Sequence, residues 1–178
     1  MPKFISFIKT LLVLGVLTII GVTIFIYSGV YPIGADVPHN AFTFSVLEII
    51  REKSVKRASN DVKVPNDLKS VERLLAGGAD YNDMCASCHS KPGETDNDFS
   101  IGLYPRPPNL YSENSISADN IEFKRQFWII KHGIKASGMP AWGKTHSDER
   151  IWNMVAFLQQ LPRLNETQYQ IMTARGGE

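Results

Sequence analysis

A long apolar stretch at the amino terminus limits what this chain can fold into more than any other feature. Phe4 to Tyr27 is almost wholly apolar, and residues 10–27 carry no charge. At about 1.5 Å of rise per residue, roughly 20 such residues cross the hydrocarbon core of a bilayer. The stretch exceeds the ~7–15 residues of a signal-peptide core, and no clear small-residue cleavage site follows it. We therefore expect residues 1–34 to be a transmembrane anchor or uncleaved signal, with a cleaved signal peptide as the alternative.

The charges beside this stretch predict its orientation. Lys3 and Lys9 precede its uncharged part, residues 10–27, whereas Asp36 follows it. Because basic residues collect on the cytoplasmic side of a membrane, we expect the rest of the chain to lie outside the cytoplasm. Without those two lysines, 17 basic and 18 acidic residues remain. This near-neutral bulk charge gives no case for a nucleic-acid partner, so we expect none, and it does not address a local basic patch.

Residues 35–66 are expected to form a helical extension and a linker. Apolar residues recur at near-helical spacing over residues 41–57, and basic residues gather at the end of this segment. Such a helix either packs on the following domain or on a partner subunit, or lies on anionic lipid. The small number of basic residues favours the packing alternative. Residues 61–67, with Pro65 among them, are typical of a linker.

Three more helices are expected in residues 67–162, and no strand pattern accompanies them. They run over residues 68–84, 118–132 and from 147 to just before Pro162. The expected N-cap residues are Asn66 or Asp67, Ser117, and Ser147 or Asp148. Residues 91–116 are rich in Pro, Gly, Asn, Asp and Ser and are expected to form a long irregular loop, a length that usually serves a function. Residues 163–178 are expected to be a polar, loosely held tail, and the fold class is all-α.

The only two cysteines, Cys85 and Cys88, are followed at once by His89. In C-x-x-C-H, each thiol adds to one vinyl group of a haem, and the histidine then lies beneath the iron as an axial ligand. A redox disulfide usually sits in a βαβ pattern, which is missing here. A structural zinc site would need a second pair of ligands. The motif therefore predicts one covalently bound haem c.

The second axial ligand is predicted to be Met139. A thioether ligand favours the ferrous state and suits electron transfer. Met139 lies in a loop between glycines, and Pro140 stiffens the chain after it. The other candidates are expected to be structural, to fill the core or to be exposed: Met84, Met154, Met172, His39, His132 and His146.

With these residues in view, residues 67–162 resemble the class I, mono-haem cytochrome c family, here in a membrane-anchored form. Gly77 and Tyr81 are similar to the glycine and aromatic positions of the family's first helix. Phe157, within residues 155–158, is similar to the aromatic partner on the last helix. A small residue and a facing ring of this kind allow two helices to cross closely.

The resemblance also implies the surroundings of the haem. Pro107 and Pro108 are similar to the family's segment beside the proximal histidine, where a carbonyl accepts the second imidazole N–H. The sequence does not decide which of the two prolines provides it. Trp142 is the expected ring near a haem propionate. The anchor and residues 35–66 depart from the family pattern and indicate a tethered cytochrome or a subunit of a membrane complex.

These features together predict an electron-transfer protein with no catalytic residues. The resemblance implies a quinol-oxidising complex or a dehydrogenase as electron donor and a terminal oxidase or reductase as acceptor. It also implies a location on the periplasmic side of a bacterial inner membrane. One alternative is a fixed haem subunit of a larger oxidoreductase. Another is a haem peroxidase or gas sensor with a displaceable sixth ligand, in which His132 or His146 would act.

Overall fold

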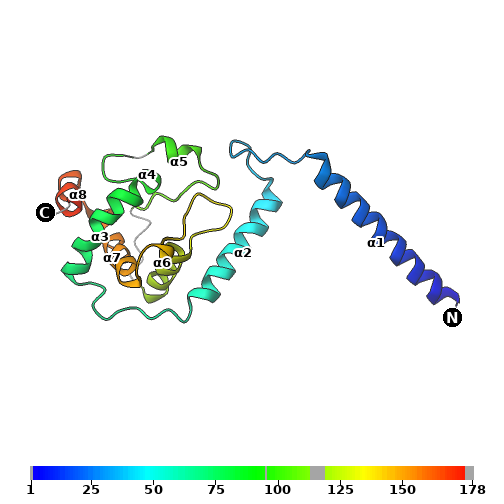
Figure 1. The fold of residues 1–178 in the computed structure, drawn as a ribbon, viewed down its shortest axis with the longest axis horizontal. Helices are drawn as coiled ribbons and strands as arrows, with labels where there is room; N and C mark the ends of the chain where they lie inside the picture. Colours follow the sequence, from blue (N-terminus) through cyan, green and yellow to red (C-terminus); the bar gives the residue numbers. More distant parts are fainter. Residues whose placement is uncertain (1, 95, 113–118, 175–178) are drawn as a thin grey trace. The chain divides into compact units, whose positions relative to one another are not determined.

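The computed structural model describes residues 2–94, 96–112 and 119–174, and these fold into helices, turns and one isolated bridge between Lys91 and Glu94. They form two compact units, residues 1–37 and 38–178 (Figure 1). The α-helices are α1 (Pro2–Ser28), α2 (Ala41–Ser59), α3 (Val71–Met84), α4 (Ala86–His89), α5 (Asp98–Gly102), α6 (Asn120–His132), α7 (Asp148–Leu158) and α8 (Glu166–Thr173). Two short 3₁₀ helices cover Trp142–Lys144 and Leu161–Arg163.

The first unit is dominated by α1. Lys3–Ser28 is the one helix among the described residues that is long and apolar enough to cross a membrane. The hydroxyls of Thr10, Thr18 and Thr23 each donate to the carbonyl four residues earlier, at 2.8–3.1 Å. These bonds satisfy the polar side chains within the helix, as a hydrocarbon environment requires. The apolar helix fits a membrane anchor.

The second unit is built on the crossing of α3 and α7. A Cβ added to Gly77 would lie 2.0 Å from the carbonyl oxygen of Asn153, so the two backbones touch. Beside this contact the rings of Tyr81 and Phe157 lie 5.4 Å apart, and both are buried. The expected glycine-and-aromatic crossing is therefore confirmed. Because a side chain at position 77 would push the helices apart, glycine is required here.

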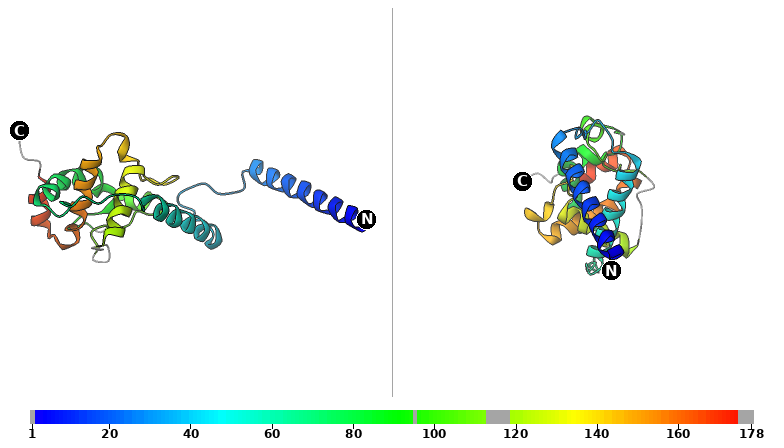
Figure 2. Two further views of the ribbon diagram at one scale, coloured as in Figure 1. Left: turned by 90° about the horizontal axis from the view of Figure 1, so that it is seen from below. Right: turned by 90° about the vertical axis from the view of Figure 1, so that its right-hand side faces the viewer.

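The remaining helices surround this crossing. α6 packs on α7 through the stacked rings of Phe127 and Trp152, whose centroids are 4.2 Å apart. α2 packs on α6, and α8 packs on α3. In Figures 1 and 2, α2 and α8 lie at opposite ends of this unit. The packing of the 41–57 helix on the following domain was expected and is confirmed, with two further residues at its end.

Several helix boundaries differ from those expected. α3 starts at Val71 instead of near Leu68, because the N–H of Leu68 bonds to Pro65 in a turn and the side chain of Ser70 caps the helix. α6 is capped by Asp119, whose side chain accepts from the N–H of Glu122, so it does not begin at position 118. The predicted N-cap Ser117 lies outside the described residues. α7 begins after Ser147 as expected.

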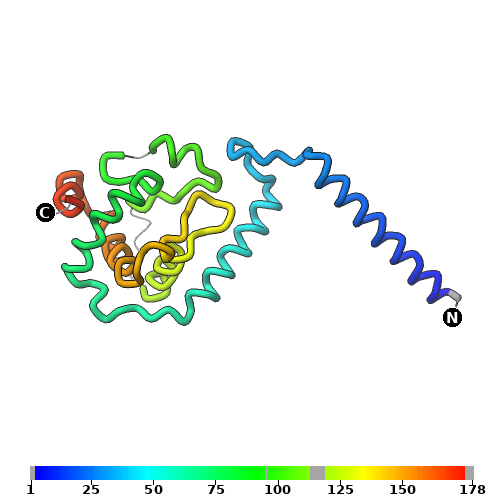
Figure 3. The backbone as a smooth tube through the Cα atoms, in the orientation of Figure 1, coloured from blue at the N-terminus to red at the C-terminus, as the bar shows by residue number. Residues whose placement is uncertain are grey.

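Besides the short α4, two α-helices were not expected. Within the long loop, α5 forms behind a capping box made by Asn97 and Ser100. After Pro162 the chain forms α8, which opens on a second capping box between Asn165 and Gln168. Tyr169 of α8 is buried, and its hydroxyl bonds to the side chain of Asn82 on α3. The expectation of a loosely held tail is therefore wrong for residues 166–173. Figure 3 traces the backbone of α3 into α4 as a tube.

Candidate functional site

One short helical turn carries both cysteines and the histidine. The backbone N–H groups of Cys88 and His89 both donate to the carbonyl of Cys85, at 3.1 and 2.9 Å. Residues three and four positions apart share a helix face, so the three side chains point from the same side of α4. Both thiols are free rather than joined in a disulfide. Burial, with the Asp80 carboxylate and Cys88 nearby, raises the pKa of Cys85 to about 12.

The imidazole of His89 is held by one directed hydrogen bond. Its Nδ1 lies 2.8 Å from the carbonyl oxygen of Pro108, and since a carbonyl only accepts, Nδ1 carries the proton. A second hydrogen bond joins the segment that follows Pro108 to His89, because the N–H of Leu110 donates to the carbonyl of His89 at 3.0 Å. Desolvation lowers the pKa of His89 more than the bond to Pro108 raises it. The ring is therefore neutral, with the lone pair of Nε2 available to a metal.

Tyr81 fixes the chain where it leaves this turn. Its buried hydroxyl donates to the carbonyl of Ser90 at 2.6 Å. Ser90 itself has a positive φ of 69°, which turns the backbone sharply after α4. The ring that packs against Phe157 at the helix crossing thus also positions residues 85–89, which we refer to as the attachment turn because the sequence predicts haem attachment there. Its hydroxyl couples the α3–α7 contact to the orientation of His89.

Met139 lies in a loop that closes on itself after α6. Its carbonyl accepts from the N–H of Ile134 at 3.2 Å, and its N–H donates to the hydroxyl of Ser137 at 3.1 Å. Gly133 has φ of 65°, and a Cβ there would lie 2.7 Å from the carbonyl oxygen of Met139. A Cβ on Gly138 would meet the side chain of Leu103 at 2.6 Å. Two glycines therefore hold this thioether on a tightly packed loop.

Trp142 contacts a histidine for which the sequence suggested no specific partner. Its ring lies edge-on to that of His146, with centroids 5.3 Å apart. The Nε2 of His146 lies 3.2 Å from the sulfur of Met84, the residue just before Cys85. The segment after Met139 is thereby joined to the attachment turn. No sequence signal could have indicated this contact, because 146 and 84 are distant in the chain and neither lies in a motif.

The predicted site residues fall into two groups that share one core. His89 and Pro108 are in direct contact, and Cys85 and Cys88 share their turn. Met139 and Trp142 come from the segment after α6. Half-buried residues of both groups pack against the buried core: Met84, Cys85, Leu110, Tyr111, Met139 and Trp142.

The alternative histidine ligands have other surroundings. The backbone N–H of His39 bonds to the hydroxyl of Tyr104, and the two rings lie 5.3 Å apart. The ring of His132 lies 4.8 Å from that of Trp128, one turn earlier on α6. Among the residues that the structure describes, no three His, Cys, Asp or Glu side chains gather into a metal cluster.

The donor set fits a haem. Two thiols on one face of a turn can reach neighbouring edges of one macrocycle, and the adjacent imidazole offers Nε2 while Nδ1 is engaged. A thioether on a glycine-bounded loop is the type of second ligand that such haems use. The half-buried apolar side chains around these donors suit a flat apolar cofactor.

The comparison with known protein families identifies one match. Residues 72–158 match the family described as cytochrome C oxidase, cbb3-type, subunit III. The matched range begins in α3 and ends with α7, so it contains the attachment turn, the loop and the crossing helices. No curated protein and no solved structure gives a match to this chain.

Proposed function

Residues 72–158 form a domain of the c-type cytochrome family, and on this basis we propose that the chain is a membrane-tethered, mono-haem electron carrier. The domain makes the protein a haem-binding electron-transfer cytochrome. The proposal adds that a single haem is bound covalently through Cys85 and Cys88. It further adds that His89 and Met139 are the axial ligands of its iron.

The observation that carries this proposal is the hydrogen bond from His89 Nδ1 to the Pro108 carbonyl. It leaves Nε2 as the only free ring nitrogen and makes the imidazole a stronger ligand. The loop closed around Met139 supports a soft sulfur ligand on a backbone with little freedom. A haem bound here supplies a one-electron couple whose potential is tuned by its axial ligands and by burial. With both axial positions filled, no position is left for a substrate, so the protein passes electrons without catalysing a reaction.

The ligand assignment is tested by exchanging methionines for leucine, which keeps the side-chain volume. In the oxidised protein, Met139→Leu is expected to lose the weak iron–sulfur charge-transfer band at the red end of the visible spectrum. The matched control is Met172→Leu, a half-buried methionine of α8, which should keep the band. A Met139→Leu protein that retains the band would contradict the assignment. Rapid binding of carbon monoxide by the reduced wild-type protein would favour the sensor or peroxidase alternative instead.

Covalent attachment has its own test. Extraction with acidified organic solvent removes a non-covalent haem but leaves thioether-linked haem on the polypeptide. The intact mass should therefore exceed that of the bare chain by one haem, located by digestion to the peptide with Cys85 and Cys88. A mass increase of two haems, or none, would refute the mono-haem proposal.

A second candidate is a fixed subunit of a larger membrane oxidoreductase. The description of the matched family, which names an oxidase subunit, favours it. This candidate predicts that the protein purifies in mild detergent together with other membrane chains. A stable, fully haem-loaded monomer that reduces or oxidises soluble partners would favour the independent carrier.

The proposed location is the periplasmic side of a bacterial inner membrane, with α1 as a single span. Lys3 and Lys9 at the start of the span and Asp36 after it support this orientation. The proposed redox partners are a quinol-oxidising complex or dehydrogenase as donor and a terminal oxidase or reductase as acceptor. Protease added to intact spheroplasts should remove the haem domain, whereas protease added to inverted vesicles should not.

A further inference from the structure

Two faces of α2 carry side chains of different kinds. The face toward the domain carries Glu48, Glu52, Val55 and Ser59, spaced four, three and four residues apart along one side of the helix. Val55 and Ser59 are buried. Among the other exposed side chains of α2, the large ones are apolar in its first half and basic in its second half, and the small ones are Ala41, Ser45, Ser54 and Ala58.

The outer stripe follows the same helical spacing. It runs through Phe42, Val46, Ile49, Lys53 and Lys56, with Ile50 and Arg57 beside it, and all seven are exposed. Phe42 is 78% exposed and Ile49 is 59% exposed, values far above those of a packed side chain. Both acidic residues of the helix lie on the inner face, so the outer face carries positive charge only. We refer to these seven residues as the α2 outer face.

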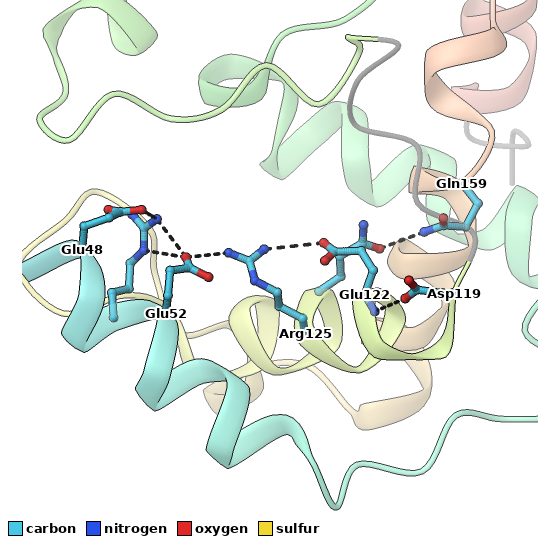
Figure 4. A network of polar contacts seen from close by, with 8 residues as sticks. Glu48, Glu52, Asp119, Glu122, Arg125 and Gln159 are labelled. Atoms are coloured by element: carbon cyan, nitrogen blue, oxygen red, sulfur yellow. Dashed lines mark hydrogen bonds and ion pairs between the residues drawn. The ribbon is translucent and has the colours of Figure 1, made fainter. Parts of the chain in front are cut away.

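An ion pair between α2 and α6 holds the inner face of α2 against the domain. Arg125 of α6 binds Glu52 at 2.8 Å and also reaches Glu122 at 3.5 Å. Arg51 binds both Glu52 and Glu48 on its own helix. Figure 4 shows this chain of contacts running from Glu48 across to α6. Because the inner face is held in this way, the outer face has a defined direction relative to the cytochrome domain.

We propose that the α2 outer face docks on the surface of the anionic lipid bilayer that holds α1. The apolar half enters the headgroup region, and Lys53, Lys56 and Arg57 bind lipid phosphates. Amphipathic helices with an apolar face and basic residues bind such surfaces. The inference rests on the membrane tether of the proposed function.

Two observations favour lipid over a protein partner. The apolar half of the α2 outer face is the end next to the span, and only residues 29–40 separate α1 from α2. At ~3.3–3.6 Å per residue this connection cannot exceed about 43 Å, so α2 stays near the bilayer and its binding there is intramolecular. Charge is the second argument, since an anionic surface attracts a face with three bases and no acid. Docking would set the direction in which the haem edge faces.

The test places spin labels on the full-length holoprotein in lipid nanodiscs. Ile49→Cys and Val46→Cys label the α2 outer face, and Ile171→Cys on α8, 70% exposed, is the matched control at the opposite end of the domain. Discs contain phosphatidylcholine alone or with phosphatidylglycerol. At positions 46 and 49, the ratio of oxygen accessibility to water-soluble nickel-complex accessibility should exceed that at 171 severalfold. Anionic lipid should increase the ratio further, and Lys53→Gln/Lys56→Gln/Arg57→Gln should abolish that increase.

Each other result overturns the inference in a recognisable way. Labels at 46 and 49 that are as accessible to nickel as the label at 171 overturn lipid docking alone. Protection that appears only when another membrane chain is added assigns the face to a protein partner and also overturns it. A holoprotein that fails to remain with the discs overturns the tether and the inference together. The visible haem spectrum, read on the same samples, separates all of these from a failure of the electron-carrier proposal.

Discussion

At the scale of single residues, Gly77 is where two helices come closest. A methyl group there would meet backbone atoms of Asn153 at 2.0 and 2.4 Å, and backbone cannot rotate away as a side chain can. Gly77→Ala is therefore expected to lower the free energy of unfolding by ~2–3 kcal/mol through overpacking. The measurement is urea unfolding of the holoprotein followed by circular dichroism.

The control for this substitution is Gly102→Ala at the end of α5. A Cβ at Gly102 meets nothing within 4 Å, so its effect should stay below ~1 kcal/mol. Equal effects of the two alanines would show that the α3–α7 crossing relaxes freely, contrary to the backbone contact seen here.

Asp80 of α3 and Arg150 of α7 form an ion pair between the two crossing helices. The guanidinium donates from Nε and one terminal nitrogen to both carboxylate oxygens, at 2.6 and 2.7 Å, and Asp80 is buried. Arg150→Ala leaves this carboxylate without its partner and should cost ~2 kcal/mol of unfolding free energy. The exposed pair of Arg106 and Asp96 serves as comparison, and Arg106→Ala should cost less than ~1 kcal/mol. Thermal unfolding of both variants distinguishes a structural ion pair from a surface one.

At the scale of elements, α8 packs closely against α3. Gly78 allows the approach, since a Cβ there would lie 2.3 Å from the carbonyl oxygen of Met172. Tyr169 fills the interface, and removing its ring in Tyr169→Ala should cost ~3 kcal/mol. Ile171→Ala, on the exposed side of the same helix, should change stability by less than ~1 kcal/mol. If differential scanning calorimetry finds the two variants alike, α8 does not contribute to the core.

The docking of α2 on α6 is expected to weaken in acid. Burial alone would raise the pKa of Glu52, but hydrogen bonds from Arg125 and Arg51 hold it below its ordinary value of about 4.5. A carboxyl with a lowered pKa contributes stability that is complete above its unfolded pKa and is lost as pH falls through the folded value. Hydrogen-exchange protection of α2, corrected for intrinsic rates, should therefore fall between pH 6 and acid conditions near pH 3–4.

Glu52→Gln isolates this contribution. It removes the titrating group and leaves Glu48 and Glu122 in place, so the fall in α2 protection with acid should become smaller than in wild type. Burial raises the pKa of Glu122, and this carboxyl is present in both proteins. A Glu52→Gln protein with an unchanged acid dependence would assign the effect to one of the other carboxylates.

Sequence patterns predicted which of the longer helices exist better than they predicted where those helices begin and end. The helices around α3, α6 and α7 follow from apolar periodicity, and Ser147 was identifiable as a cap. α5 and α8 were missed because both are short and begin with capping boxes whose first residue is asparagine, within segments that look polar. Tyr169 is a single aromatic ring in a polar stretch, so the sequence alone gives no helical pattern there. Its burial in the core shows that α8 is part of the fold.

The candidate site shows a similar division. The attachment motif, the loop with Met139 and the proline pair were all recognisable in the sequence. The choice of Pro108 over Pro107 needed the backbone path, because both carbonyls precede the same segment. The contact of His146 with Met84 depends on how two distant segments meet, which no local pattern encodes.

At the scale of the whole molecule, the two compact units predict a separable domain. Every core residue that the structure describes, and the predicted haem site, fall within residues 38–178. A chain that begins at residue 38, exported and haem-loaded, should be water-soluble and should keep the visible spectrum and midpoint potential of the full-length protein. Redox titration of both forms is the measurement. A shifted potential or a lost sulfur band would show that α1 takes part in the haem site.

The contact between Gly77 and Asn153 also determines how this domain folds. This contact closes a loop made of residues 78–152, which is most of the range 72–158 that matches the family. Such a non-local contact slows folding, because loop-closure entropy is lost before the helices gain their packing. Yet that entropy grows only logarithmically, by ~0.6 kcal/mol for each doubling of loop length. The segments between the two crossing helices, which carry the predicted haem ligands, can therefore change in length at a small cost in loop-closure entropy while the crossing itself is kept.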